Sequence, residues 1–285
     1  MSGATIDALA ALACYGFGDV IYKRAARSGL TSGAFLMGQA WFFCPAIIVY
    51  AWLTGTLIWS PAALWGAAAG VAFLLGFYNY AHSLRTGSVS VIAPVFRLNF
   101  IVTAALAMAL LGEPLTTRKL AGFLLALVAG WLLLGGSWHG DGGDPAATRR
   151  ALVRVLIATL AVGAANFFYK LGLIGGATPA TMLVAQSLVF TSLVTTTTCA
   201  ANRIVRPPRG FAWHSGPAAL VLLGASLFLL RGLKHGQASV IVPIAQMGFV
   251  VAAVLGVVVF NEGWTGRKVG GLCAAAGALA LLAIG

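Results

Sequence analysis

A few polar side chains lie inside long apolar runs of this sequence, where they could bind a polar ligand or carry a proton. The most informative is Arg97, within the run 88–111. A guanidinium is permanently charged and can bind a carboxylate through two parallel hydrogen bonds. Leaving this charge in hydrocarbon would cost about 2.5 kcal/mol or more. We therefore predict that Arg97 contacts an anionic part of a substrate. The alternatives are snorkelling to an interface and a structural ion pair.

Two titratable residues are candidates for carrying a proton. Asp19 is the carboxylate placed deepest in an apolar run, about one turn from the end of the run 6–22. It could be a proton site or a partner for Lys23 at the interface. His82 is the second candidate because histidine commonly carries protons, although a lone histidine near an interface is more often structural.

The apolar runs themselves determine the class of protein. The chain is 60% hydrophobic and 8% charged, with a mean hydropathy of +0.94, whereas soluble proteins are roughly 45–50% apolar and about 25% charged. The runs lack the alternation of barrel strands and reach the roughly 20 residues that a membrane helix needs. We predict an all-α integral membrane protein with ten transmembrane helices. The predicted spans are 6–22, 31–53, 61–84, 88–111, 116–136, 150–173, 178–200, 213–233, 237–260 and 265–284.

The two halves of the chain repeat each other. Residues 87–134 recur without a gap as residues 236–283, with 18 of the 48 aligned pairs identical, and a shift of 147 aligns the front of each half, including Gly16 with Gly163. Because five spans is an odd number, two successive five-span units must cross the membrane in opposite senses. The sequence therefore predicts a 5+5 inverted repeat. Its parts are a first repeat at 1–136, a connecting loop at 137–149 and a second repeat at 150–285.

Three glutamines are predicted to lie at about the same depth in the membrane as Arg97. At 1.5 Å per residue, Gln39 and Arg97 lie roughly 12 to 14 Å from the same membrane face, and Gln186 and Gln246 lie at the equivalent depths from the opposite face. We predict that these residues line a substrate site near the midplane. Interhelical hydrogen bonding is the alternative for the glutamines. Further candidates for the cavity lining are Tyr78, Asn79 and Asn99.

Two other repeated features concern the ends and bends of helices. Glu113 and Glu262 occupy matching turns and are expected to cap and salt-bridge the helix that follows each of them. Pro94 and Pro243 lie in matching spans, where each removes a backbone donor and permits a kink.

Ten spans, the 5+5 duplication and the motif Gly112-Glu113-Pro114-Leu115 before a glycine-rich helix resemble the drug/metabolite transporter superfamily, in its EamA-type branch. The stretch 80–94 is similar to the junction between the third and fourth spans of that family. The resemblance covers essentially the whole chain and implies a secondary transporter. Its motifs do not specify the substrate, because similar members export amino acids, purines, drugs or sugar-linked compounds.

The orientation predicted from charge differs from the habit of that family. Loops after odd-numbered spans and their flanks hold twelve basic residues and loops after even-numbered spans hold five, with Arg97 excluded. The positive-inside rule then places both termini on the same side, outside the cytoplasm. Members of the family commonly keep both termini in the cytoplasm.

We therefore expect a secondary transporter in the cell (inner) membrane, an exporter of a small polar metabolite such as an amino acid or organic anion, working by alternating access. A flippase for a lipid-linked sugar and a broad-specificity drug exporter are the alternatives. We do not expect an enzyme, because the sequence offers no catalytic set and no phosphate-binding loop. The expected partners are a small-molecule substrate, membrane lipids and possible coupling protons, in a monomer or homodimer. Nucleic acid, cofactor and metal are not expected.

Overall fold

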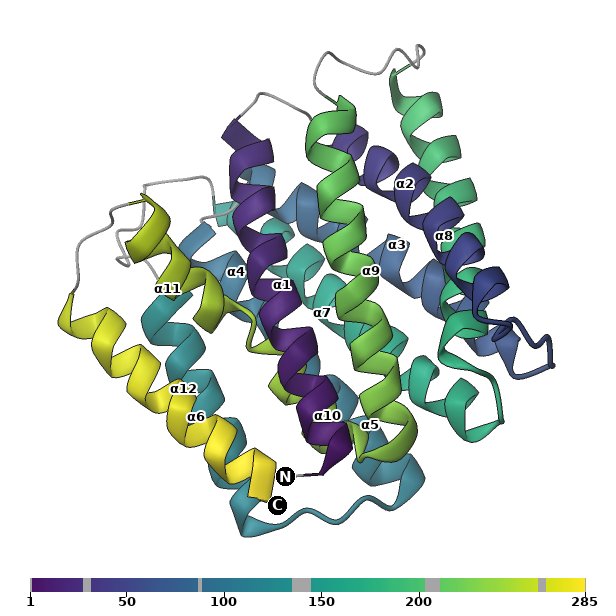
Figure 1. Ribbon diagram of the computed structural model, residues 1–285. Coiled ribbons are helices and arrows are strands. Elements are labelled where there is room, and N and C mark those ends of the chain that lie inside the picture. Colours follow the sequence, from purple (N-terminus) through teal and green to yellow (C-terminus); the bar gives the residue numbers. More distant parts are fainter. Residues whose placement is uncertain are drawn as a thin grey trace.

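The chain folds into helices standing side by side (Figure 1). The computed structural model describes residues 2–27, 32–86, 89–134, 145–202, 211–260 and 265–284, and these ranges contain no strand. The helices are α1 (Gly3–Arg27), α2 (Ser32–Leu53), α3 (Ala63–Thr86), α4 (Val89–Arg97), α5 (Asn99–Leu111), α6 (Thr117–Leu134), α7 (Pro145–Ile174), α8 (Pro179–Asn202), α9 (Phe211–His235), α10 (Ala238–Gln246), α11 (Phe249–Phe260) and α12 (Gly266–Ile284). Within the described ranges, eight stretches are long and apolar enough to cross a membrane. The prediction of an all-helical, multi-pass membrane protein is confirmed.

Two of the predicted spans are broken helices. The span predicted over 88–111 is divided into α4 and α5 at Leu98, and the span predicted over 237–260 is divided into α10 and α11 at Met247 and Gly248. Each of these two predicted spans therefore consists of two short helices.

The two breaks have the same local structure. The Leu98 N–H donates to the Val95 carbonyl at 3.1 Å, and the Met247 N–H donates to the Ile244 carbonyl at 3.1 Å. These bonds span three residues and replace the four-residue bonds of an α-helix. Pro94 and Pro243 each lie three residues before the end of the first helical piece. The expected kinks are thus complete breaks just beyond the prolines.

Two boundaries also differ from the sequence prediction. Helix α1 continues to Arg27, five residues beyond the predicted end, and so includes basic residues that were predicted to follow the span. Helix α7 begins at Pro145, so residues 145–149 of the predicted connecting loop are helical. The remaining connector residues, 137–144, lie outside the described residues. The same is true of the predicted span residues 31, 88 and 135–136.

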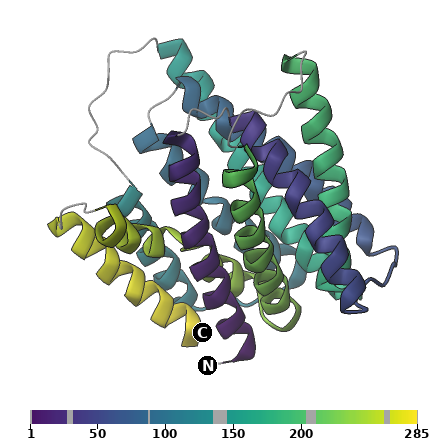
Figure 2. The ribbon, with the colours of Figure 1, turned by 45° about the horizontal axis from the view of Figure 1, so that its top comes forward.

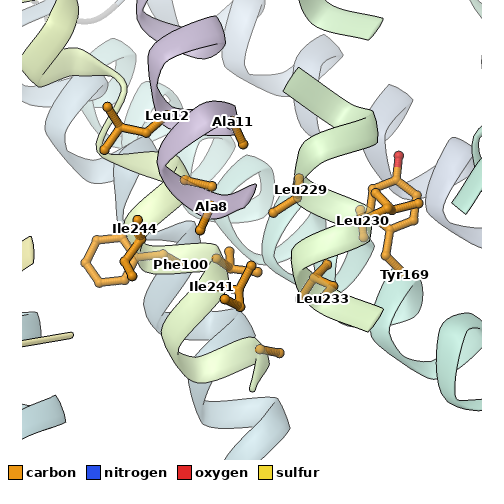
Figure 3. Close-up of a cluster of buried hydrophobic side chains, with 14 of the residues drawn as sticks. Ala8, Ala11, Leu12, Phe100, Tyr169, Leu229, Leu230, Leu233, Ile241 and Ile244 are labelled. Carbon is orange, nitrogen blue, oxygen red and sulfur yellow. The ribbon is translucent and has the colours of Figure 1, made fainter. Parts of the chain in front are cut away.

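Helix pairs form the walls of the molecule. Helix α3 packs against α7 and α8, α1 packs against α9, and α6 packs against α12. Figures 1 and 2 place α6 and α12 beside each other at one edge, and they place both termini at the same end. At that end the core is filled by buried residues of α1, α9 and α10, including Ala8, Leu229 and Ile241 (Figure 3).

Helices α1 and α7 each meet a broken helix through a glycine. A Cβ added to Gly16 would lie 2.4 Å from the Val251 Cβ and 2.6 Å from the Gly248 carbonyl oxygen. A Cβ added to Gly163 would lie 2.5 Å from the Val102 Cβ and 2.8 Å from the Asn99 carbonyl oxygen. The backbones are in direct contact at both crossings, which only glycine allows.

Replacing Gly16 by alanine should therefore lower the free energy of unfolding by about 1–3 kcal/mol, because the added methyl group would push α1 away from α11. Thermal unfolding in detergent measures this change. Gly18→Ala is the matched control on the same helix, since its Cβ would meet only Val221 at an ordinary 3.9 Å. Equal stability of the two variants would contradict the close contact.

Candidate functional site

An ion pair lies beside the break in the first half of the chain. The Arg97 Nη2 donates to the Asp19 Oδ2 at 3.0 Å, and the two side chains are 23% and 27% exposed. Arg97 is the last residue of α4, and its guanidinium carbon lies 6.0 Å from the centre of the Phe249 ring. Arg97 therefore already has an anionic partner within the protein. This partner is Asp19, the carboxylate that the sequence suggested as a proton site.

Asp19 lies deeper in its helix than the sequence indicated. Because α1 runs to Arg27, eight residues follow Asp19 within the helix, which is about 12 Å rather than one turn. The phenols of Tyr22 and Tyr80 lie within electrostatic reach of the carboxylate. Tyr15 lies one turn before Asp19 on the same side of α1.

Two tyrosine–glutamine pairs accompany the ion pair. The Gln39 Nε2 donates to the Tyr22 hydroxyl at 2.6 Å and to the Ala218 carbonyl at 3.3 Å. The Tyr169 hydroxyl donates to the Gln186 Oε1 at 3.1 Å. Tyr169 and Gln186 are the residues that the shift of 147 aligns with Tyr22 and Gln39. Both halves therefore join the same two positions by an interhelical hydrogen bond, donated by the glutamine in the first half and by the tyrosine in the second. This is the structural role considered for Gln39 and Gln186.

The second half replaces both charges by amides. Gln246, the last residue of α10, corresponds to Arg97, and the shift of 147 aligns Asn166 with Asp19. Asn166 is 1% exposed, and its Nδ2 has no hydrogen-bond partner among the described residues. Gln246 is half-buried. Sequence reasoning missed Asn166, although the alignment of the repeats could have found it.

The other predicted site residues lie apart from this group or differ in exposure. Asn99 begins α5, is 1% exposed and donates to the Phe96 carbonyl at 2.8 Å. Asn79 donates to the Leu75 carbonyl one turn back along its own helix. Tyr78 is 50% exposed and stacks on His82 with ring centres 4.3 Å apart.

The position of Tyr78 and His82 on α3 separates them from the site. Both lie on the side of the helix that carries the exposed Val71 and Leu75, whereas Phe77 and Tyr80 contact Phe96 of α4 from the other side. We leave Tyr78 and His82 out of the proposed site for this reason.

An apolar pocket of about 460 Å³ adjoins Arg97. Its walls come from α4, α5, α6 and α11, and its lining includes Leu98, Gly130, Trp131 and Phe249. Leu98 and Phe249 flank the breaks in the two broken helices. The pocket therefore lies where a change at either break would alter its shape.

A second polar cluster, near the termini, was not predicted. Lys119 is 0% exposed and donates to the Pro114 carbonyl at 2.8 Å, to the Ser239 hydroxyl at 2.9 Å and to the Gln237 side chain. The Glu113 carboxylate accepts the Ala238 and Ser239 N–H groups at 2.7 and 2.8 Å. Glu113 thus caps α10, in the other half of the chain, and the expectation that it caps the following helix is wrong. Glu262 lies outside the described residues.

Lys170 completes the cluster by binding the end of α9. Its Nζ donates to the carbonyls of Leu233 and Gly236 at 2.8 and 2.7 Å, where a cation satisfies the last carbonyls of the helix. The turn between α9 and α10 is consequently held from both sides.

Comparison with known proteins places part of the chain beside a transporter family. Residues 4–135 match the EamA-like transporter family. The resemblance carried by the Gly112-Glu113-Pro114-Leu115 motif is confirmed for this part of the chain. An EamA-like protein is a transporter of the drug/metabolite type, and the helical, multi-pass architecture agrees with that class.

The fold of the chain is also similar to a solved structure. A crystal structure described only as "Crystal structure of protein" has a TM-score of 0.81 at 16% identity, covering 99% of this chain and 97% of that chain. At this identity the similarity shows the fold alone. Among curated proteins, none matches the chain.

Proposed function

We propose that the protein is a secondary transporter of a small anionic metabolite, and that the Arg97–Asp19 pair is its binding and coupling site. The pair at 3.0 Å, beside the break of α4 and α5, is the observation that carries the proposal. Transporters built from repeats place substrates near the bilayer midplane at the ends of such broken helices. An amino acid or organic acid supplies the carboxylate that a guanidinium binds best.

In this proposal the substrate and Asp19 compete for the same guanidinium. A proton on Asp19 removes the negative charge from its carboxylate, and Arg97 can then bind the anionic group of the substrate. Protonation and substrate binding therefore favour each other, and each changes the affinity for the other by the same factor. Arg97 is already compensated in the free protein, so the bound anion replaces one partner with another and leaves no charge unpaired.

The alternating access of this site rests on two five-helix repeats, 1–136 and 150–285, that cross the membrane in opposite senses. The matching contacts of Gly16 and Gly163 with the breaks support this arrangement. So do the matching pairs Tyr22–Gln39 and Tyr169–Gln186. The Lys119 cluster would be one gate, because it ties α6 to α10 at the end where the termini lie. The resemblance to the family favours export and location in the cell membrane. Because proton and substrate bind together in this scheme, export would be driven by an outward gradient of the acid and not by an inward proton gradient.

Reconstitution into liposomes tests the function directly. A panel of amino acids, organic acids and cationic drugs is offered with and without a pH gradient, and substrate accumulation is measured. We expect acids to be transported in a pH-dependent way, Asp19→Asn to abolish the pH dependence and Arg97→Gln to abolish transport of acids. Asp7→Asn is the matched control, because Asp7 lies near the other end of α1 beside Arg231.

Two results would contradict the proposal. Unchanged rate and pH dependence in folded Asp19→Asn protein would return the pair to a purely structural role. Transport of the cationic drugs in place of the acids would favour a broad-specificity drug exporter.

A further inference from the structure

The pocket beside Arg97 has a chemical character that narrows the substrate class. Among the described residues that line it, Arg97 is the one charged residue, and the other side chains are apolar or aromatic, with Leu98, Ala126, Trp131 and Phe249 among them. Apart from Arg97 and the Trp131 indole N–H, these side chains offer no hydrogen-bonding groups, and burying hydroxyl or ammonium groups without hydrogen bonds is costly. A ligand that fills the pocket must therefore be apolar except where it reaches the guanidinium.

The volume and the aromatic lining of the pocket further restrict the ligands that it can bind. A volume of about 460 Å³ falls within the range of pockets for small organic ligands, roughly 300–1,000 Å³. Phe249 and Trp131 offer ring faces and edges that favour another aromatic ring. Phe249 also lies 6.0 Å from the Arg97 guanidinium, so the apolar surface and the anion site are adjacent.

From these observations we propose that the pocket binds the apolar part of an amphipathic acid, a carboxylate bearing an aromatic or branched group, while Arg97 binds the carboxylate. This inference rests on the proposed function and specifies the substrate class of the same site. Because the pocket touches Leu98 and Phe249, the apolar group contacts both breaks. The site therefore distinguishes such an acid from a small acid that reaches only the arginine.

Binding of three probes to the purified full-length protein in detergent tests the inference. The probes are 3-phenylpropionate, which has both features, propionate, which lacks the ring, and 3-phenylpropanamide, which lacks the charge. Affinity is measured by titration of the unfolding temperature, at acidic and neutral pH. We expect 3-phenylpropionate to bind at least about tenfold more tightly than either other probe. Propionate loses the burial of the ring, which is worth more than the one or two methylene equivalents that a tenfold ratio requires, and the amide loses the charge-assisted hydrogen bonds to Arg97.

A larger side chain introduced into the pocket tests whether 3-phenylpropionate binds there. Gly130 lies in the lining, and a Cβ there would meet only the Phe249 ring, at 3.9 Å, so Gly130→Leu places its side chain in the pocket without a clash at the Cβ. This variant should lose about tenfold in affinity for 3-phenylpropionate and little for propionate. Gly216→Leu is the matched control, because it adds the same side chain to open space on α9.

The possible outcomes separate the two proposals. Equal affinity for propionate and 3-phenylpropionate would overturn the pocket assignment and leave the anion site intact. Equal affinity for the acid and the amide, unaffected by Arg97→Gln, would also overturn it, because the pocket would then bind apolar molecules without the arginine. Failure of every acid to bind, together with failure of acid transport in liposomes, would overturn the proposed function itself.

Discussion

Exchanging Asp19 for asparagine, or Arg97 for glutamine, should lower the free energy of unfolding by on the order of 3 kcal/mol, whereas making both exchanges together should recover most of that loss. Each single change leaves one charge without its partner in a region of low dielectric constant. The side chains are about one quarter exposed, so we take the low end of the effect seen when buried pairs are broken.

The substitutions in the double variant are taken from the second half of the chain. The second half carries Asn166 and Gln246 at the positions equivalent to Asp19 and Arg97, so Asp19→Asn with Arg97→Gln makes the halves alike. Two amides can form a hydrogen bond to each other, and neither carries a charge into the membrane. The four proteins form a double-mutant cycle, measured by denaturant unfolding in a single detergent.

The cycle also separates stability from transport. If the pair only holds α1 against α4, the double variant should recover both stability and transport of acids. If the pair is the site, stability should return and transport should not. A double variant that is as unstable as the sum of its parts would show that the two charges do not interact energetically, contrary to their 3.0 Å contact.

The positions of the helices could be predicted from the sequence because lipid imposes a strong constraint on composition. Each predicted span coincides with one helix, or with a pair of short helices, to within a few residues. The breaks at Leu98 and Met247 could not be predicted in this way. Their neighbours are as apolar as the rest of the span, and Pro94 and Pro243 indicate a bend without fixing its extent.

The candidate site was predicted in part, and the errors have physical causes. Arg97 and Gln39 were found because polar groups are conspicuous in apolar runs. Asp19 was placed too near the interface because the basic residues after Tyr22 were interpreted as a loop, whereas α1 includes them. Its contact with Arg97 joins residues that are 78 apart in sequence, and such a pairing depends on helix packing that periodicity does not determine.

Lys119 is the clearest example of a residue whose role the sequence concealed. A lysine beside an arginine in a short turn is typical of a solvated loop, and the prediction counted it among the loop charges. The structure buries it completely against α10. Its burial depends on acceptors from the other half of the chain, at Gln237 and Ser239, more than one hundred residues away.

Replacing Lys119 by methionine should therefore destabilise the protein strongly, by about 3 kcal/mol or more. Methionine has a similar length, so packing is largely kept, but the Pro114 carbonyl, the Gln237 side chain and the Ser239 hydroxyl each lose a charged donor. A single hydrogen bond to a charged group contributes about 1.5–3 kcal/mol, and buried acceptors left without partners add to the cost. The nearby Glu113 carboxylate would also lose a positive neighbour while it caps α10.

Arg118→Met is the matched control, because Arg118 is the adjacent residue, is exposed and loses the same charge. Unfolding of both variants in detergent should give a large loss for Lys119→Met and a change within about 0.5 kcal/mol for Arg118→Met. If the cluster closes the end near the termini, as proposed, Lys119→Met should also make a cysteine placed at Ala238, which is 0% exposed, react faster with a water-soluble thiol reagent. If the two variants are equally stable and the cysteine stays protected in both, the Lys119 cluster neither stabilises the protein nor holds that end closed.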